Sequence, residues 1–481
     1  MTEKLTLTHE RVDDIPLLIG LERRLDLPRL LDQCLGNHGL HRGLSNGVLA
    51  TTWMAFIASE ADHRKSTVQD WAERHRQTLE RLLGQPIRSV EFSDDRLGIV
   101  LRRLSRTPNW EALEAELWAK TMAVYDLDQG MTGVRLDSTT AYGYHTPTED
   151  GVMQFGHSKD HRPDLPQLKL MAAGIEPSGH LLACDVWPGQ SADDPLYQPL
   201  IARVRQMLGR TGLLYTGDCK MAALATRAEI VAHGDYYLTP LPLTGQTRAE
   251  FDAWVDKAVE SGDLESVELL WDGQRLLGAG YEFERQLRAE AAGETVEWTE
   301  RVQVVRSRDL ALQQAKQLAE RLGQAEAALL ALTPEPGRGK RQYRDEVALR
   351  TAIAEVEAQH RVSGLLRVTW RREEQSVTFS LFSRSSLFAL FAFITRYVGR
   401  GRGGPNRPTW TEVNVRYVVT DVRRDEEAIA KQRHRLGWRV QVTNLPRAKM
   451  TLAQAVSHYR GGWSLEIGQP QCPRTDHRSA L

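Results

Sequence analysis

The chain has 481 residues, of which 41% are hydrophobic, and its 62 lysines and arginines nearly balance its 63 acidic residues. This length predicts two to four domains, and the composition excludes a disordered or collagen-like chain. The longest apolar run, residues 387–394, is far shorter than the roughly 20 residues that span a membrane, so we expect no membrane partner. The four cysteines form no CxxC pair, and residues 1–14 lack the apolar stretch of a secretory signal, which predicts a cytoplasmic protein.

Residues 1–125 show the periodicity of helices. Apolar side chains recur on one face of residues 47–59. Ser93 is a candidate N-cap for a helix that begins with Asp94 and Asp95, whose negative charges suit the positive first turn. We therefore expect a helical N-terminal region. Its spacing is consistent both with a DNA-binding helix-turn-helix and with a plain hydrophobic core.

Residues 126–241 alternate between strands and helices. The expected order is three strands, a helix, a strand, a helix and a final strand, at residues 133–137, 168–175, 180–186, 195–208, 213–218, 222–233 and 236–241. A hairpin sheet followed by helical crossovers predicts an α/β fold with a mixed sheet, rather than a doubly wound nucleotide-binding fold.

Residues 242–446 interrupt that pattern and predict an inserted β-rich domain. Two long helices are expected at residues 309–332 and 344–360, joined by a turn rich in proline, glycine and basic residues. The expected strands lie at residues 267–271, 296–305, 364–370, 377–382, 413–420 and 439–444. The two helices predict a helical hairpin arm within the insertion.

Two acidic residues stand where predicted hydrophobic strands end. Asp137 follows one strand in RLDSTT, and Asp218 follows another in LLYTGDCK. A single acid at such a place is often only a helix cap or a turn former. Two acids at the ends of neighbouring strands repel each other unless a cation lies between them, and hard oxygen ligands favour Mg²⁺ or Mn²⁺. The pair therefore predicts a divalent metal site that lacks a third acid.

Several short segments, in this order, resemble one known family. They are the segment at residues 94–105 (DDRLGIVLRRLS), RLDSTT, the segments at residues 155–170, 192–197 (ADDPLY) and 215–230, and the late TNLP and HYRGGWSLE. Together they are similar to bacterial insertion-sequence transposases of the DDE type. The resemblance covers nearly the whole chain to Glu466. It implies an RNase H-like mixed sheet core, interrupted by a β-rich insertion and preceded by a helical DNA-binding region.

The resemblance assigns three catalytic acids, which are Asp137, Asp218 and Glu466, with Glu466 on a core helix within residues 447–466. In this family the three carboxylates hold two Mg²⁺ or Mn²⁺ ions. The implied activity is cleavage of the element's ends and strand transfer into target DNA. The implied partners are the terminal inverted repeats, target DNA and a second copy of the chain in a synaptic homodimer, in the nucleoid.

Basic and aromatic residues in three places are candidate DNA contacts. A loop between the first two strands and the tip of the helical hairpin carry basic side chains, and the resemblance adds a pair near the third acid. Basic side chains of this kind suit phosphate contacts, although charged runs are more often solvated surfaces. The candidates are His157, Lys159, His161, Arg162, Arg338, Lys340, Tyr459 and Arg460.

The end of the chain departs from the family. Gly462 stands at the pattern's arginine position, and Pro473 stands where the family has a lysine. Gly468 and Pro470 disfavour a helix beyond Glu466, since proline costs roughly 3 kcal/mol and glycine about 1 kcal/mol there.

Residues 467–481 therefore predict a truncated or frameshifted tail, and a genuine short tail is the alternative. We expect this form to fold its core but to be inactive or weak in strand transfer. The competing functions are an inactive remnant that binds DNA ends, a non-enzymatic helical scaffold, and a host nuclease.

Overall fold

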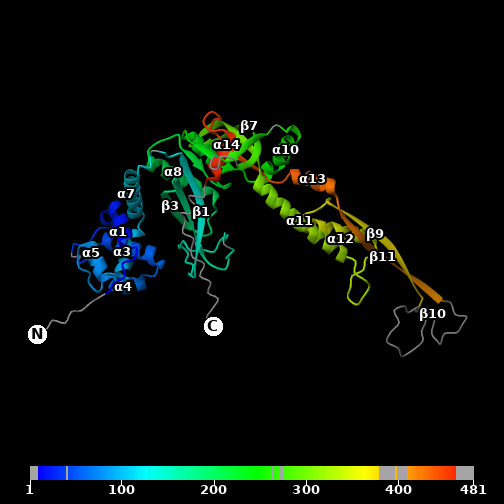
Figure 1. Cartoon of the computed structure of the whole chain (residues 1–481), viewed down its shortest axis with the longest axis horizontal. Coiled ribbons are helices and arrows are strands. Elements are labelled where there is room, and N and C mark those ends of the chain that lie inside the picture. The colour runs from blue at the N-terminus through cyan, green and yellow to red at the C-terminus, as the bar shows by residue number, and fades with distance from the viewer. Residues whose placement is uncertain are drawn as a thin grey trace, which may run out of the picture.

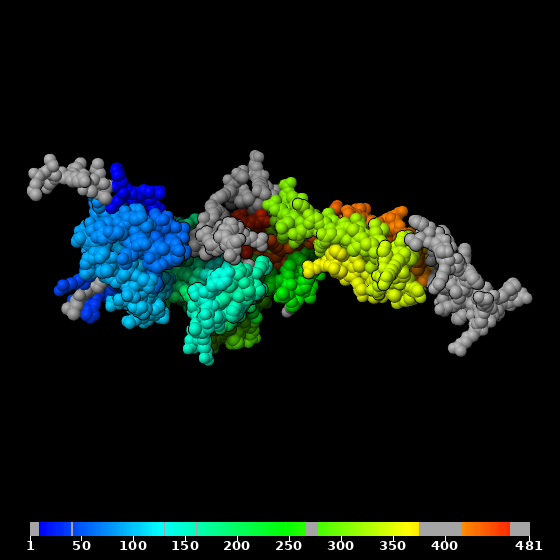
Figure 2. Space-filling view, turned by 90° about the horizontal axis from the view of Figure 1, so that it is seen from below, coloured from blue at the N-terminus to red at the C-terminus, as the bar shows by residue number. Residues whose placement is uncertain are grey.

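The computed structural model describes residues 9–39, 42–128, 130–159, 161–262, 264–269, 275–378, 396–397 and 409–461. The molecule is elongated, with N-terminal helices at one end, a central sheet, and an arm that ends in a ribbon of strands (Figure 1). The same three parts follow one another when the molecule is seen from below (Figure 2). No helix within these described ranges is long and apolar enough to span a membrane.

The N-terminal part is helical, as the periodicity predicts. Its helices are α1 (Ile15–Arg24), α2 (Leu27–Leu35), α3 (Asn46–Glu60), α4 (Lys65–Arg74), α5 (Arg76–Leu83), α6 (Asp94–Leu104) and α7 (Thr107–Tyr125). The Ser45 hydroxyl accepts a hydrogen bond from the Val48 amide and caps α3, and Ser93 precedes α6 as expected. These helices share one hydrophobic core around the fully buried Trp71 and the buried Phe56.

The central sheet has nine strands in the order β3-β2-β1-β4-β5-β12-β8-β7-β6. Its first half contains β1 (Gly133–Tyr142), β2 (Gln167–Glu176), β3 (Leu181–Pro188), β4 (Leu214–Thr216) and β5 (Tyr236–Pro240). β2 is antiparallel to β1 and β3, whereas β4 is parallel to both β1 and β5. This order and these directions are those of an RNase H-like core, so the predicted fold class is confirmed.

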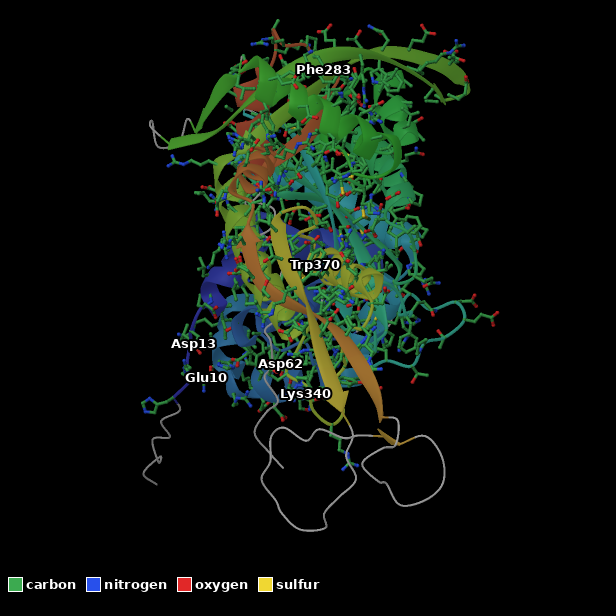
Figure 3. The ribbon with its side chains drawn as sticks, turned by 90° about the vertical axis from the view of Figure 1, so that its right-hand side faces the viewer. Glu10, Asp13, Asp62, Phe283, Lys340 and Trp370 are labelled. Carbon is green, nitrogen blue, oxygen red and sulfur yellow. The ribbon has the colours of Figure 1, made fainter. Side chains whose placement is uncertain are left out.

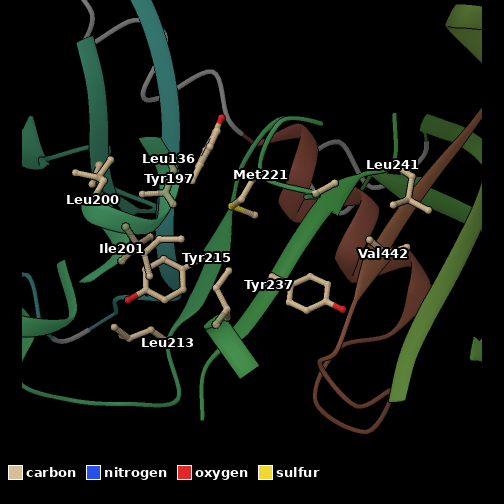
Figure 4. Close-up of a cluster of buried hydrophobic side chains, with 14 of the residues drawn as sticks. Leu136, Tyr197, Leu200, Ile201, Leu213, Tyr215, Met221, Tyr237, Leu241 and Val442 are labelled. Atoms are coloured by element: carbon tan, nitrogen blue, oxygen red, sulfur yellow. The ribbon is translucent and has the colours of Figure 1, made fainter. Parts of the chain in front are cut away.

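Helices cover this half of the sheet. The crossover from β3 to β4 contains α8 (Tyr197–Leu208), and α9 (Leu224–Ala232) links β4 to β5. Alternate residues of the strands face α8 and form a large hydrophobic core with it. Figure 4 shows part of that core, with Leu136, Tyr215 and Tyr237 from the strands and Leu200 and Ile201 from α8.

The remaining sheet strands come from the segment expected to be an insertion. They are β6 (Glu265–Leu269), β7 (Arg275–Ala291), β8 (Glu294–Ser307) and β12 (Trp438–Thr443), and α10 (Gly245–Ser261) precedes them. β12 is antiparallel to both β5 and β8, and therefore joins the two halves into one sheet. Strand pairing thus continues across residue 242, and part of the 242–446 segment belongs to the central sheet.

The arm consists of a helical hairpin and a ribbon of strands. Its elements are α11 (Arg308–Ala331), α12 (Glu346–Gln359), β9 (Leu366–Thr378), β10 (Arg396–Tyr397), β11 (Thr409–Arg424) and α13 (Glu426–His434). Both expected long helices are present. β9 is one continuous strand paired with β11, where two strands at 364–370 and 377–382 were expected, and residues 379–382 lie outside the described residues. Gly437 returns the chain to the sheet with φ +86°, where a Cβ atom would lie 2.5 Å from that of Ala311.

Candidate active site

Asp137 lies in the middle of a strand rather than at its end. β1 continues to Tyr142 because it pairs with β2 over all ten of its residues, which corrects the expected strand end. The parallel pairing with β4 is short and joins Val134 to Tyr215 and Arg135 to Thr216. If this register is extended by two residues, past the end of β4, Asp137 lies level with Asp218.

Asp137 lies within β1, and Asp218 lies just beyond the end of the neighbouring strand β4. Side chains two residues apart in a strand point to the same face. Arg135 and Asp137 therefore share a face with Thr216, whereas Leu136 belongs to the opposite face, which is covered by α8. Asp218 follows two residues after the last residue of β4. Both aspartates are half-buried.

Asp218 is held from three directions. Its Oδ1 accepts hydrogen bonds from the Tyr197 hydroxyl at 2.7 Å and from the Lys220 amide at 2.8 Å, and its main-chain oxygen accepts one from the Thr239 hydroxyl at 2.6 Å. Gly217 makes the close approach of Met221 possible, since a Cβ there would lie 2.7 Å from the Met221 sulfur. The position of this carboxylate is therefore fixed by its own strand end and by α8.

Tyr197 connects this carboxylate to the core. Its ring is fully buried, and burial together with the negative charges of Asp218, Asp137 and Asp193 raises the pKa of its hydroxyl far above the ordinary value. The hydroxyl therefore stays protonated and donates to Asp218 across the whole physiological pH range. The sequence segment ADDPLY signalled this region, but Tyr197 was not predicted as a site residue.

Two further aspartates lie beside Tyr197 and are paired with lysines. Asp193 forms a buried ion pair with Lys169 of β2, and Asp194 lies 3.5 Å from the Lys220 ammonium. These pairs place the positive charges of Lys169 and Lys220 close to the carboxylates around Tyr197. Sequence reasoning assigned none of these four residues, although ADDPLY contains both acids.

A late helix attaches to the face that carries the aspartates. It is α14 (Leu452–Arg460), which starts with a capping box between Thr451 and Gln454. Tyr459 packs against a small cluster that includes Leu214 and Leu238 of the sheet, and burial and the charge of Asp218 raise the pKa of its phenol. The core helix predicted within residues 447–466 is thus present over Leu452–Arg460.

The third predicted acid is not part of the described structure. Glu466 and the tail at 467–481 lie outside the described residues. Arg460 donates a hydrogen bond to the Ser307 hydroxyl at 2.7 Å, and Tyr459 lies under the Arg135 guanidinium, 5.8 Å from the ring centre. The charge of Asp218 acts on Tyr459, one of the predicted residues in α14.

The basic loop between β1 and β2 contacts the site at one place. Lys159 donates hydrogen bonds to the main-chain oxygen and the hydroxyl of Ser138, at 2.5 and 2.6 Å, next to Asp137. Arg162 forms a two-point ion pair with Asp164, which partly neutralises it. His157 and His161 are exposed.

The hairpin tip lies apart from the aspartates. Arg338 and Lys340 are exposed in the loop between α11 and α12, and Lys340 extends from that loop away from the arm (Figure 3). Figure 1 shows the loop, in yellow, below α12 and well away from β1. The structure therefore does not bring these two residues together with Asp137 and Asp218.

The donor set suits a hard divalent cation. Two carboxylates on adjacent strands offer oxygen ligands of the kind that Mg²⁺ and Mn²⁺ prefer. Within the described part of the chain, no group of three or more histidine, cysteine, aspartate or glutamate side chains is arranged to hold a metal. Of the three predicted ligands, Asp137 and Asp218 lie within the described residues.

Comparisons with known proteins give distant matches of fold. No family model matches the sequence, and no curated protein matches it. A piggyBac transposase, solved in a synaptic complex with hairpin DNA, is 11% identical with a TM-score of 0.24, over 49% of this chain and 52% of that chain. Ciona intestinalis endonuclease V, solved with a 23mer DNA, is 8% identical with a TM-score of 0.15, over 34% and 74%. The matched region spans about half the length of the transposase.

Proposed function

We propose that the chain is a metal-dependent DNA-processing enzyme, and specifically a DDE transposase of an insertion sequence. The observation that supports the proposal is the register of β1 and β4, which, extended two residues past the end of β4, sets Asp137 level with Asp218 in an RNase H-like sheet. Without a bound cation, the carboxylates of Asp137 and Asp218 would repel each other, and a metal ion between them accounts for their placement.

Asp137 and Asp218 would hold the metal, and Glu466 is the proposed third ligand. Bound Mg²⁺ or Mn²⁺ would activate the attacking oxygen and stabilise the leaving oxygen of an in-line displacement at phosphorus. The protein's own part is positioning. Tyr197 holds one oxygen of Asp218 through a hydroxyl that stays protonated, and Lys159 fixes the basic loop on the residue after Asp137.

DNA is the proposed substrate, with the terminal inverted repeats and target DNA as its two forms and a homodimer as the assembly that joins two ends. The basic loop lies beside the carboxylates, where its exposed His157 and His161 and the Lys159 side chain are available to phosphates. Arg338 and Lys340 lie on an exposed loop of the arm. A DNA duplex that contacts this loop as well as the aspartates would extend beyond the active site.

The test is cleavage of supercoiled plasmid in Mn²⁺, followed by joining assays with oligonucleotides that carry the inverted repeats flanking the gene. We expect D137N and D218N each to abolish nicking, whereas D194N, which removes a nearby acid paired with Lys220, should retain it. Joining of 3′-hydroxyl ends identifies a transposase. Because this form is expected to be weak in strand transfer, the same assay is repeated with residues 467–481 replaced by a helical continuation, and cleavage that still occurs without joining identifies a nuclease. Nicking that survives D137N would exclude the proposed active site.

A further inference from the structure

Arg439 of β12 lies on the face of the sheet that carries Asp137. Side chains of adjacent residues in a strand point to opposite faces. Trp438 and Val440 flank Arg439 and belong to the hydrophobic core that α8 covers. Leu136, which precedes Asp137, belongs to the same core. Arg439 and Asp137 therefore both point away from that core, and Arg439 is exposed.

The pairing of the strands gives the distance between these two residues. One row of paired residues crosses four neighbouring strands. Its members are Arg135 of β1, Thr216 of β4, Leu238 of β5 and Thr443 of β12. Asp137 lies two residues beyond this row, and Arg439 lies four residues beyond it at the same end of the sheet, because β12 is antiparallel to the other three strands. Three strand spacings of about 4.8 Å and two residues of about 3.3 Å place the two Cα atoms roughly 16 Å apart.

Tyr459 of α14 is near both Asp218 and Arg439. Burial is the main cause that raises the pKa of its phenol, and the charge of Asp218 raises that pKa further. The positive charges of Arg135 and Arg439 act on the same phenol and lower its pKa. Arg439 and the second predicted metal ligand thus lie within electrostatic reach of one side chain.

Arg135, on the same face, is already engaged within the protein. It donates to Glu176 of β2 at 2.7 Å and to the main-chain oxygen of His458 at 2.8 Å, and its side chain is 10% exposed. Burial alone would raise the pKa of Glu176, but its contacts with His458 and Arg135 outweigh burial and hold that pKa below its ordinary value. Arg135 therefore neutralises a buried carboxylate and is not available to DNA.

Arg301 of β8 is engaged in the same way. It pairs with Thr443 of β12 and so projects on the same face as Arg439. Its guanidinium forms an ion pair with Glu282, and its side chain is 4% exposed. By contrast, no side chain among the described residues forms an ion pair or a hydrogen bond with the Arg439 guanidinium. The charge of Arg439 is therefore left to solvent or to an anion that binds there.

A second arginine reaches the same end of this face. Arg439 pairs with Val305 of β8, and Ser307 lies two residues further along that strand. Arg460 of α14 donates to the Ser307 hydroxyl at 2.7 Å. Asp309 brings an opposing charge in the first turn of α11. These three charged groups together leave a net positive charge at this end of the face.

We propose that Arg439 binds a backbone phosphate of the DNA strand that lies in the active site, within about five phosphates of the position that is cut. The inference rests on the proposed function and extends it, because it names a contact to the strand outside the carboxylates. A guanidinium is always charged and presents paired donors that match phosphate oxygens. One strand of B-DNA carries a phosphate about every 3.4 Å along the duplex axis, so roughly 16 Å corresponds to about five phosphates.

An ordinary solvated arginine is the competing explanation, and the chain offers a matched control. Arg288 of β7 belongs to the same sheet, is 70% exposed and lies 3.6 Å from Glu297. Its pairing with Glu297 places it eight residues from Val305 along β8, which is roughly 26 Å. The variant R288Q therefore removes an exposed arginine far from the active-site end of the sheet.

The measurement is binding of the full chain to duplex oligonucleotides that carry the inverted repeats flanking the gene, followed by fluorescence anisotropy in EDTA at several salt concentrations. R439Q should weaken binding at least about fivefold and reduce the slope of log K against log salt by about 0.9. R439K keeps the charge and should keep the slope. R288Q should change neither quantity.

A scan of single phosphates locates the contact. Each phosphate of one strand is replaced in turn by a neutral methylphosphonate. At one or two neighbouring positions the replacement should weaken binding by the unaltered chain and by R288Q, but not by R439Q. Nicking of the same oligonucleotide in Mn²⁺ marks the cut, and these positions should lie within about five phosphates of it.

An unchanged slope in R439Q, or an equal reduction in R288Q, would overturn the inference. A scan in which every position affects R439Q as it affects the unaltered chain would also overturn it. If the unaltered chain binds the DNA but does not nick it in Mn²⁺, the proposed function fails, whereas the slope and the scan still decide whether Arg439 contacts a phosphate.

Discussion

Replacing Asp218 by asparagine should make the metal-free protein more stable and the metal-loaded protein less stable than the unaltered chain. The register of β1 and β4 sets Asp218 beside Asp137 on strands that are about 4.8 Å apart. Without a cation, these two carboxylates repel each other. The substitution removes that repulsion, and it also removes a ligand from the proposed metal site.

The size of the effect follows from the geometry. Two charges about 5 Å apart repel by roughly 3 kcal/mol at an effective dielectric constant near 20, and screening at these half-exposed groups reduces this to about 1–2 kcal/mol. An amide oxygen still accepts from Tyr197 and Lys220, at a loss of about 0.5–1 kcal/mol. The net gain is about 0.5–1 kcal/mol without metal. A metal ion at 100 times its Kd stabilises the unaltered chain by about 2.7 kcal/mol.

The assay is urea unfolding of the unaltered chain, D218N and the control D194N, in EDTA and in Mn²⁺. The order of stability between D218N and the unaltered chain should reverse when Mn²⁺ is added, and D194N should gain from Mn²⁺ as the unaltered chain does. Equal stabilisation of D218N and the unaltered chain by Mn²⁺ would refute the metal site. A large loss of stability of D218N in EDTA would refute the expected repulsion.

Three other outcomes are expected. Y197F keeps the buried ring but removes the donor to Asp218, so it should lower the free energy of unfolding by about 1–2 kcal/mol and slow plasmid nicking; unchanged nicking would contradict this role. The pKa of Glu176 is lowered from 4.5, so its stabilisation is complete above about pH 4.5 and is lost as the pH falls below that value. Thermal unfolding from pH 7 to about pH 3 should therefore show a flatter acid limb for E176Q than for the unaltered chain, and parallel limbs would argue against the shift. R338E combined with K340E should reduce the salt dependence of DNA binding by roughly 0.9 per lost phosphate contact, and an unchanged slope would exclude the hairpin tip from DNA binding.

Local patterns in the sequence predicted most of the elements. The long helix expected at 309–332 is α11 (Arg308–Ala331), because its apolar stripe and the Ser307 cap are both local features. Asp137 and Asp218 were also recognisable, since each acid interrupts a hydrophobic strand. The strand β7 was not predicted, although the alternating apolar residues Tyr281, Phe283 and Leu287 indicate it.

The sequence by itself therefore determined most of the elements and the mixed character of the sheet. The tertiary structure decided how far each strand continues, because the length of a strand depends on its partner. β1 runs five residues past Asp137 since β2 pairs with it there, and the pairing of β12 with both β5 and β8 joins segments that looked like separate domains. It also decided the contacts of α14, since Arg135 and His458 meet although 323 residues separate them. No pattern within a few residues encodes such a contact, because it arises only when the whole sheet is formed.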